Sequence, residues 1–103
     1  MKALIISLLG LTALAANAQI TIDPPSRTFP RDGGGGAILT IGVGSWNATT
    51  EADWITITPF QSGNAGLSCI YLVSANFSAD TRQGVITINN QQHTITQTGY
   101  LAS

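Results

Sequence analysis

The stretch GVITINNQQHTITQ, residues 84–97, decides the fold class. Apolar and polar residues alternate on both sides of Asn89-Asn90, in GVITIN (84–89) and in HTITQ (93–97). A period of two is that of a β-strand with one buried face. Asparagine tolerates the left-handed backbone conformation that tight hairpin turns require. The stretch therefore predicts a β-hairpin that turns at Asn89-Asn90.

Short alternating runs of the same kind continue along the chain from residue 19, separated by Gly, Pro, Asn and Asp, and no stretch has helical periodicity. The further runs are QITID (19–23), RTF (27–29), AILTIGV (37–43), WITIT (54–58) and LSCIYLVSA (67–75). Seven short strands are typical of a β-sandwich. The sequence therefore predicts an all-β fold.

Period two also assigns the face of each run that packs in the core. The predicted core positions are Leu39, Ile41 and Val43; Leu67, Cys69, Tyr71, Val73 and Ala75; Ile86 and Ile88; and His93, Ile95 and Gln97. Ile70 and Leu72 fall on the other face of the longest run, where a two-layer sandwich normally meets water. We expect either a loop or a partner molecule to cover these two side chains.

The first eighteen residues have the composition of a secretory signal peptide. A short basic start and an apolar stretch lead to Ala16-Asn17-Ala18, an A-x-A cleavage motif. A membrane anchor would need about 20 apolar residues. We therefore expect a signal peptide (1–18) and a single domain (19–103). Because Gln19 and not cysteine follows the cleavage motif, the mature chain is expected to be secreted to the periplasm or exterior, without lipid anchor or membrane insertion.

The charge of the chain argues against binding to nucleic acid or anionic membranes, and its cysteine content excludes an intrachain disulfide. Beyond the signal peptide, three arginines stand against five acidic residues, a net charge of −2. Such a chain lacks the basic surface that attracts nucleic acid or anionic membranes. A single cysteine, Cys69, rules out an intrachain disulfide. Its thiol is expected to pack as a small core hydrophobe, and the alternative is a reactive or intermolecularly bridging thiol.

No catalytic constellation is evident. The chain has one histidine and one cysteine, and its five acidic residues stand in loops or at strand ends. Catalysis by proton transfer or nucleophilic attack needs a base beside a nucleophile, or paired carboxylates. Glu51 and Asp53 are the closest acids and are interpreted as a solvated turn, since a calcium loop needs more oxygen ligands at tighter spacing. We expect a protein that is not an enzyme and has no cofactor and no metal.

Several segments carry a family resemblance through their order and spacing. They are ITIDPPSRTF, a glycine-rich break, ILTIGVGSW, EADWITITP, GNAGLSCIYLVSANFSADTRQGVITI and HTITQTG. The most specific parts are the tryptophan followed by DWI and the N-x-S-x(3)-R-x-G stretch. The chain resembles a BACON domain, a module of gut bacteria often found beside carbohydrate-active enzymes. The resemblance implies an immunoglobulin-like β-sandwich and a non-catalytic module that recognises carbohydrate or mucin.

The polar stretch NFSADTRQG (76–84) is interpreted as a strand connection rather than a ligand site. Asp80 is a turn former, and Gly84 opens the next strand. The resemblance implies that the Asn76 amide satisfies loop backbone groups. It also implies that Arg82 packs its stem and donates to carbonyls or to Asp80.

A sugar-binding surface would need an exposed aromatic ring with amide side chains beside it. The candidate aromatic residues are Trp46, Phe60, Phe77 and Tyr100, whereas Trp54 is expected in the core. The predicted ligand-binding set is Trp46, Asn47, Phe60, Gln61 and Asn64.

Two other functions remain open from the sequence. One is a structural spacer, or an extracellular scaffold subunit that self-associates or binds a protein partner through Ile70 and Leu72. The other is a secreted inhibitor or adaptor that presents the loop FQSGNAG (60–66).

Overall fold

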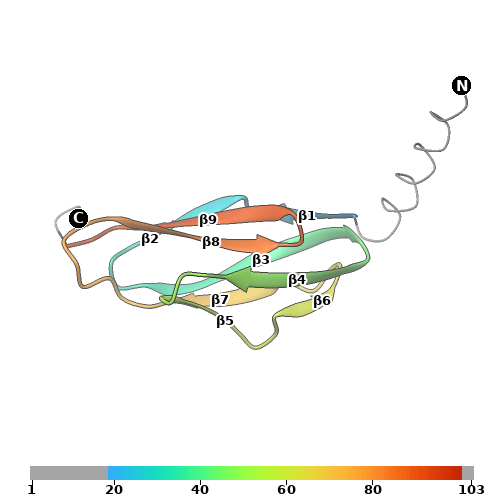
Figure 1. The fold of residues 1–103 in the computed structure, drawn as a ribbon, viewed down its shortest axis with the longest axis horizontal. Helices are drawn as coiled ribbons and strands as arrows, with labels where there is room; N and C mark the ends of the chain where they lie inside the picture. The colour runs from blue at the N-terminus through green and yellow to red at the C-terminus, as the bar shows by residue number, and fades with distance from the viewer. Residues whose placement is uncertain (1–18, 101–103) are drawn as a thin grey trace, which may run out of the picture.

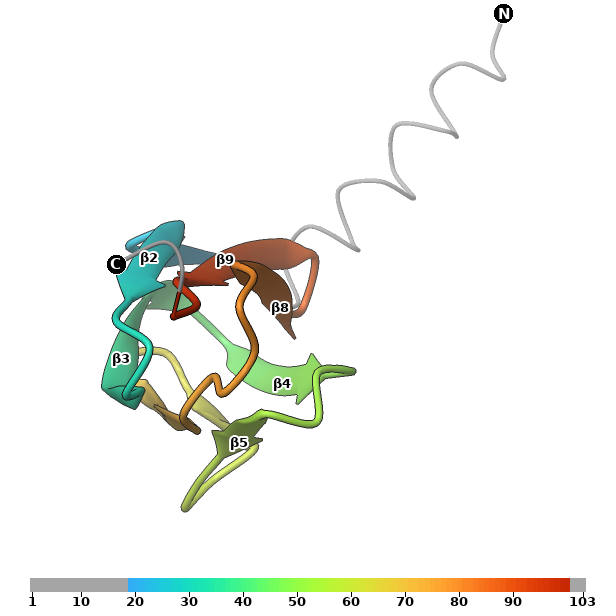
Figure 2. The ribbon, with the colours of Figure 1, turned by 90° about the vertical axis from the view of Figure 1, so that its left-hand side faces the viewer.

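The computed structural model describes residues 19–100 and folds them into two β-sheets without a helix (Figure 1). The four-stranded sheet has the order β1 (Gln19–Asp23), β3 (Gly34–Val43), β7 (Cys69–Val73) and β5 (Ile55–Ile57). The five-stranded sheet has the order β2 (Ser26–Phe29), β9 (Gln91–Gln97), β8 (Arg82–Ile88), β4 (Ser45–Thr50) and β6 (Ser62–Asn64). The end view shows the strands enclosing a central space, which the core side chains fill (Figure 2). The prediction of an all-β sandwich is confirmed, and the arrangement is compatible with the immunoglobulin-like type. The predicted signal peptide, residues 1–18, lies outside the described residues.

The seven predicted runs all contain strands, but the structure adds two strands that the sequence did not indicate. One is β4, SWNATT, in which buried Trp46 and Ala48 alternate with exposed neighbours. The other is β6, SGN, which has no side-chain pattern of its own and pairs with β4. The β4 alternation was hidden because Trp46 stands among Gly, Ser and Asn, which are usual loop residues.

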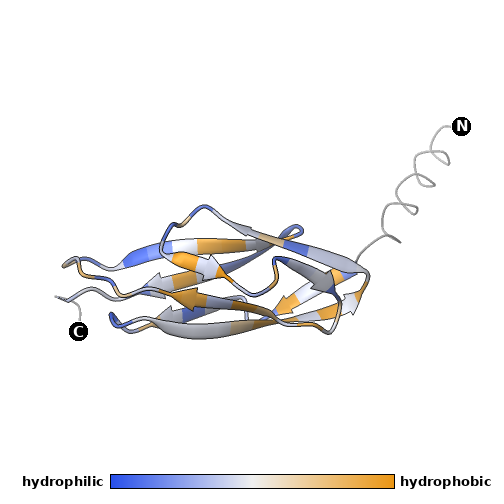
Figure 3. Ribbon diagram, turned by 90° about the horizontal axis from the view of Figure 1, so that it is seen from below, coloured by the Kyte–Doolittle hydropathy of each residue, from blue (hydrophilic) through white to orange (hydrophobic). Residues whose placement is uncertain are grey.

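The hairpin predicted from residues 84–97 is confirmed. β8 and β9 pair antiparallel with Ile88 opposite Gln91, which leaves a two-residue turn. Asn89 occupies the left-handed region, with φ of 54°. The inward side chains of both strands are buried as predicted, namely Ile86, Ile88, His93, Ile95 and Gln97. Hydrophobic residues fall along the strands, and the turns are mostly hydrophilic or neutral (Figure 3).

The predicted core face of β3 is wrong. Ile38 and Thr40 are buried, whereas the predicted core residues Leu39, Ile41 and Val43 are 43%, 46% and 61% exposed. Gly36 explains why the even-numbered positions of β3 face the core. It lies against Tyr71, and a Cβ there would lie 2.5 Å from the Tyr71 hydroxyl oxygen, so only glycine fits at this inward position.

Thr40 is compatible with burial on this inner face. Its hydroxyl donates to the Leu67 carbonyl at 2.9 Å and accepts the Gly66 N–H at 3.1 Å. The buried hydroxyl is therefore satisfied, whereas the apolar side chains of Leu39, Ile41 and Val43 point outward. Leu67, another predicted core residue, is 43% exposed because it precedes β7, and Ala75, which follows that strand, is only half-buried.

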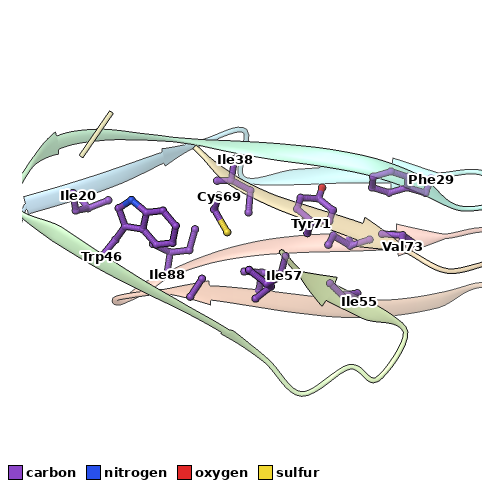
Figure 4. Close-up of a cluster of buried hydrophobic side chains, with 13 residues drawn as sticks. Ile20, Phe29, Ile38, Trp46, Ile55, Ile57, Cys69, Tyr71, Val73 and Ile88 are labelled. Carbon is purple, nitrogen blue, oxygen red and sulfur yellow. The ribbon is translucent and has the colours of Figure 1, made fainter. Parts of the chain in front are cut away.

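The core runs the length of the sandwich between the two sheets. Trp46 and Ile88 lie toward one end, and Tyr71 and Phe29 lie toward the other (Figure 4). Tyr71 and Phe29 meet edge to face with ring centroids 5.9 Å apart, a favourable aromatic geometry. Cys69 is buried in this core, as expected of a small core hydrophobe.

A hydrogen-bonded pair crosses the core between the sheets. Nδ1 of His93 lies 2.7 Å from the Pro24 carbonyl, and Nε2 lies 2.8 Å from the Tyr71 hydroxyl. Because a carbonyl oxygen can only accept, Nδ1 carries the proton, and the neutral ring accepts at Nε2 from Tyr71. In residues 19–100 no buried side-chain nitrogen or oxygen lacks a partner.

Candidate functional site

The prediction that Trp46 binds a ligand is wrong, because its side chain is fully buried. Its exposed fraction is 0%, and its Nε1 donates to the Asn64 carbonyl at 3.1 Å. A Cβ at Gly63 would lie 3.1 Å from its ring, so β6 covers the indole closely. Neither ring face can stack on a sugar.

The other predicted ligand residues are exposed but only partly brought together. Asn47 and Asn64 stand on paired strands and line a shallow depression of about 320 Å³ over β4 and β6. The side-chain amide of Gln61 already makes a hydrogen bond within the protein, since its Nε2 donates to the Ile57 carbonyl at 2.6 Å. Phe60 is 57% exposed and is not among the lining residues. The depression thus offers amides without an open aromatic ring.

The candidate recognition loop of residues 60–66 is tied into the sheet. It contains β6, which pairs with β4, and the Gln61 carbonyl accepts the Ala48 N–H at 2.8 Å. The segment is therefore not a free loop that presents a peptide to a protease.

The first part of the polar stretch, residues 76–81, is a hydrogen-bonded turn at one end of the sandwich, and its last three residues, 82–84, begin β8. The Asn76 amide nitrogen donates to the carbonyls of Asp80 (2.9 Å) and Thr98 (3.2 Å). Asn76 Oδ1 accepts the Ser78 N–H at 3.1 Å. Asn76 is buried at 2% exposure, so its amide holds the turn and faces no ligand.

Arg82 joins this turn to the sheet. Its guanidinium donates to the carbonyls of Ser74 (3.2 Å) and Ala75 (3.1 Å), and its Nε donates to Gln97 Oε1 at 2.8 Å. The same guanidinium lies 4.3 Å from the centroid of the Trp54 ring, a cation–π contact.

Trp54 is half-buried rather than fully in the core. Beneath it, Gly84 leaves room for the indole, since a Cβ there would lie 2.9 Å from the ring Cζ2. With Arg82 over its ring, Trp54 is a packing residue whose remaining surface borders a groove. The expectation of a core residue is therefore met only in part.

This groove, which we call the β4–β8 groove, has a volume of about 730 Å³. That size is in the range of ligand sites, about 300–1,000 Å³. Its lining consists of Thr49, Thr50, Glu51, Ala52, Asp53, Trp54, Gln83, Gly84, Val85, Thr87 and Gln92.

A transverse row of three polar side chains is the most regular feature of the groove. Thr87 on β8 pairs with Thr49 on β4 and with Gln92 on β9, so the three residues stand in line across the sheet. At one side Glu51 and Asp53 add two carboxylates and Trp54 adds an apolar edge. The row presents hydroxyl and amide groups that both donate and accept hydrogen bonds.

Sequence reasoning missed the groove because three separated strands build it. From the sequence alone, Glu51 and Asp53 indicate a solvated turn, and SWNATT does not stand out as a strand. The alternation in SWNATT is the signal that could have placed Thr49 on an exposed sheet face.

The two residues with potential nucleophilic chemistry are held inactive in the core. Burial raises the pKa of the Cys69 thiol to about 11, so it is protonated at neutral pH. Burial also lowers the pKa of His93, and both of its nitrogens are engaged by Pro24 and Tyr71. Neither ring nitrogen is available to deprotonate the thiol.

The described part of the chain has neither a cluster of metal ligands nor a helix that could span a membrane. Residues 19–100 contain no group of three or more His, Cys, Asp or Glu placed to hold a metal ion. They also contain no helix of the length and apolarity needed to cross a membrane.

Comparison with known families identifies the domain. A family model described as the viral BACON domain matches residues 19–103. The chain belongs to the viral BACON domain family. The resemblance predicted from the sequence is thereby confirmed, and the match covers the whole segment after the predicted signal peptide.

This BACON domain is also similar to part of a solved enzyme structure. The structure is a Bacteroides ovatus GH5 xyloglucanase in complex with a XXXG heptasaccharide, with a TM-score of 0.72 and 17% sequence identity. The match covers 80% of this chain and 19% of the xyloglucanase chain. At this identity the likeness concerns the fold alone. No curated protein matches the chain.

Proposed function

We propose that this BACON domain is a secreted, non-catalytic module that binds carbohydrate, including mucin-type glycans, through the β4–β8 groove. The observation that carries the proposal is the row formed by Thr49, Thr87 and Gln92 across three paired strands. Sugar hydroxyls need partners that both donate and accept, and these side chains do so without charge. The rigid sheet fixes their spacing, which limits the entropy lost on binding.

The surroundings of the row support a sugar rather than a charged ligand. Val85 and the edge of Trp54 offer apolar surface to the C–H groups of a sugar ring. Glu51 and Asp53 provide acceptors for sugar hydroxyls and would repel an anionic ligand such as a phosphate. The xyloglucanase, whose chain contains a domain of this fold, is a second support because that protein acts on a polysaccharide.

The shallow groove predicts weak binding. Each hydrogen bond contributes a net of about 0.5–1.5 kcal/mol. A shallow site that makes only a handful of such bonds is expected to bind with a Kd of about 0.2–1 mM, which corresponds to about −5 to −4 kcal/mol. Weak individual sites are compatible with adhesion, where many copies act together.

The test is a glycan array followed by calorimetry on residues 19–103, with mucin O-glycans and the XXXG heptasaccharide as probes. Thr87→Val removes a groove hydroxyl while keeping a β-branched shape, so we expect about a fivefold loss of affinity. Thr94→Val is the matched control, since Thr94 stands on β9 but is not among the lining residues. Absence of binding to every glycan, or equal loss in both variants, would refute the proposal.

A non-catalytic role is part of this proposal and is supported by the state of Cys69 and His93. The test is incubation of the protein with the bound glycans, followed by product analysis. Unchanged glycans are expected, and cleaved products would overturn this part.

A further inference from the structure

The β4–β8 groove carries two acidic side chains and no basic one. Glu51 and Asp53 are exposed and line the groove together with Thr49, Thr87 and Gln92. None of the lining residues is an arginine, a lysine or a histidine. The groove therefore combines uncharged hydrogen-bonding side chains with two negative charges that no positive charge within it balances.

Arg82 contacts a residue of the groove without lining it. Its guanidinium lies 4.3 Å from the centroid of the Trp54 ring, but its donors are committed to Gln97 Oε1 and to the carbonyls of Ser74 and Ala75. The side chains of β8 that line the groove stand at positions 83, 85 and 87, and Arg82 belongs to the alternate set, whose later members are buried. Its charge is therefore held on the other side of the strand.

The remaining cations of the described chain also lie outside the groove. Arg27 donates to the Gly35 carbonyl at 3.3 Å, and Arg31 lies 4.6 Å from the centroid of the Tyr100 ring. Residues 19–103 contain no lysine, and their one histidine is buried in the core. The amino group that cleavage before Gln19 would create belongs to β1, in the other sheet.

We propose that the β4–β8 groove binds neutral glycans in preference to sialylated or sulfated ones, with Glu51 and Asp53 as the specificity-determining residues. This inference rests on the proposed function and adds the chemical class of the ligand. Sialic acid and sulfate esters carry a fixed negative charge, which the two carboxylates repel. A repulsive element against the wrong ligand is a common source of specificity.

The two carboxylates act in opposite directions on the two classes of glycan. Their oxygens accept hydrogen bonds from sugar hydroxyls, and such charge-assisted bonds are stronger than those between neutral groups. The hydroxyl and amide groups of Thr49, Thr87 and Gln92 add partners that need no charge on the ligand. An anionic sugar gains the same hydrogen bonds but meets the repulsion as well.

The expected selectivity is moderate, because the groove is shallow and open to water. For an anion about 9 Å from each carboxylate, repulsion through water weakens binding about threefold at low ionic strength. At about 0.5 M salt the Debye length is shorter than that distance, so most of the difference should disappear. The preference for neutral glycans is therefore expected to depend on salt.

The test is an NMR titration of residues 19–103 with a neutral mucin O-glycan and with the same glycan carrying one sialic acid, at about 0.02 and 0.5 M salt. The wild type should bind the neutral glycan about three times more tightly at low salt. Glu51→Gln with Asp53→Asn keeps both shapes and removes both charges, so the ratio should fall toward one. Asp23→Asn with Asp32→Asn is the matched control, because it removes the same charge from exposed acids outside the groove.

The outcomes separate this inference from the proposed function. A wild type that binds the sialylated glycan as tightly as the neutral one at low salt would overturn the inference and leave carbohydrate binding standing. An equal fall of the ratio in both double variants would overturn the role of Glu51 and Asp53. Binding of neither glycan would count against the proposed function.

A second measurement tests the charge of the groove without a glycan. Relaxation of amide protons by an anionic nitroxide is compared with relaxation by a cationic nitroxide of similar size. The cationic probe should have the stronger effect at Thr49, Thr87 and Gln92, and the difference should shrink in Glu51→Gln with Asp53→Asn. Equal relaxation by the two probes in the wild type would overturn the inference, whichever glycans bind.

Discussion

Alanine substitution at the adjacent positions Ile38 and Leu39 tests which side chains of β3 face the core. Ile38 is 0% exposed, and Leu39 is 43% exposed on the opposite face of the same strand. Truncating a buried Leu or Ile to Ala costs about 2–5 kcal/mol, because apolar burial is lost and a cavity remains. We expect about 3 kcal/mol for Ile38→Ala and less than about 1 kcal/mol for Leu39→Ala, since Leu39 is already partly in water.

The assay is urea unfolding of residues 19–103 at about 5 µM. A destabilisation of about 3 kcal/mol should also lower the melting temperature by roughly 12–24 °C in a domain of this length. The two substitutions lie at neighbouring positions of one strand and remove aliphatic side chains of the same size, so each serves as a control for the other. A larger loss for Leu39→Ala than for Ile38→Ala would refute the assignment of Ile38 to the core and of Leu39 to the surface.

Three further predictions follow from buried and terminal groups. Because burial lowers the pKa of His93 below its unfolded value of about 6.5, the unfolded chain gains a proton first as pH falls. Stability should therefore be fully present well above pH 6.5 and fall as the pH drops through about 6.5 and below, with a smaller fall in His93→Gln; a wild type insensitive to pH over this range would contradict this. Tyr71→Phe leaves Nε2 of His93 without its donor and should cost about 1–3 kcal/mol in urea unfolding, whereas a neutral effect would show that this hydrogen bond is not needed. Finally, the mass of the exported protein should correspond to a chain that begins at Gln19, and a retained leader would disprove cleavage after Ala18.

The β8–β9 hairpin was predictable because two independent local signals agreed. Alternation set the faces of both strands, and Asn89-Asn90 supplied the turn chemistry that joins them. The buried face of β7 was also assigned correctly, with Cys69, Tyr71 and Val73 inward and Ile70 and Leu72 outward, although both faces of this strand are apolar.

The face of β3 was not predictable from hydrophobicity alone. The outward side carries Leu39, Ile41 and Val43, which are more apolar as a set than the residues that face inward. Gly36 faces inward because the Tyr71 ring needs the space, and Thr40 faces inward because two backbone groups satisfy its hydroxyl. Both reasons depend on residues far away in sequence.

The β4–β8 groove could not be predicted from the sequence either, because it also depends on contacts between distant segments. The exposed position of a tryptophan cannot be inferred from loop-like neighbours, since Trp46 stands among such residues and is fully buried. The row of Thr49, Thr87 and Gln92 exists only through strand pairing across three segments of the chain. Register of this kind is set by tertiary structure, so only the polarity of each residue could be read in advance.

The most direct test of carbohydrate binding is an amide NMR titration of residues 19–103 with the best-binding glycan from the array. The proposal predicts that the largest shift changes lie on the β4–β8 groove, at Thr49, Thr87 and Gln92, and that they saturate with a Kd of about 0.2–1 mM. Saturable changes confined to another surface, or no change at millimolar glycan, would contradict the groove as the binding site.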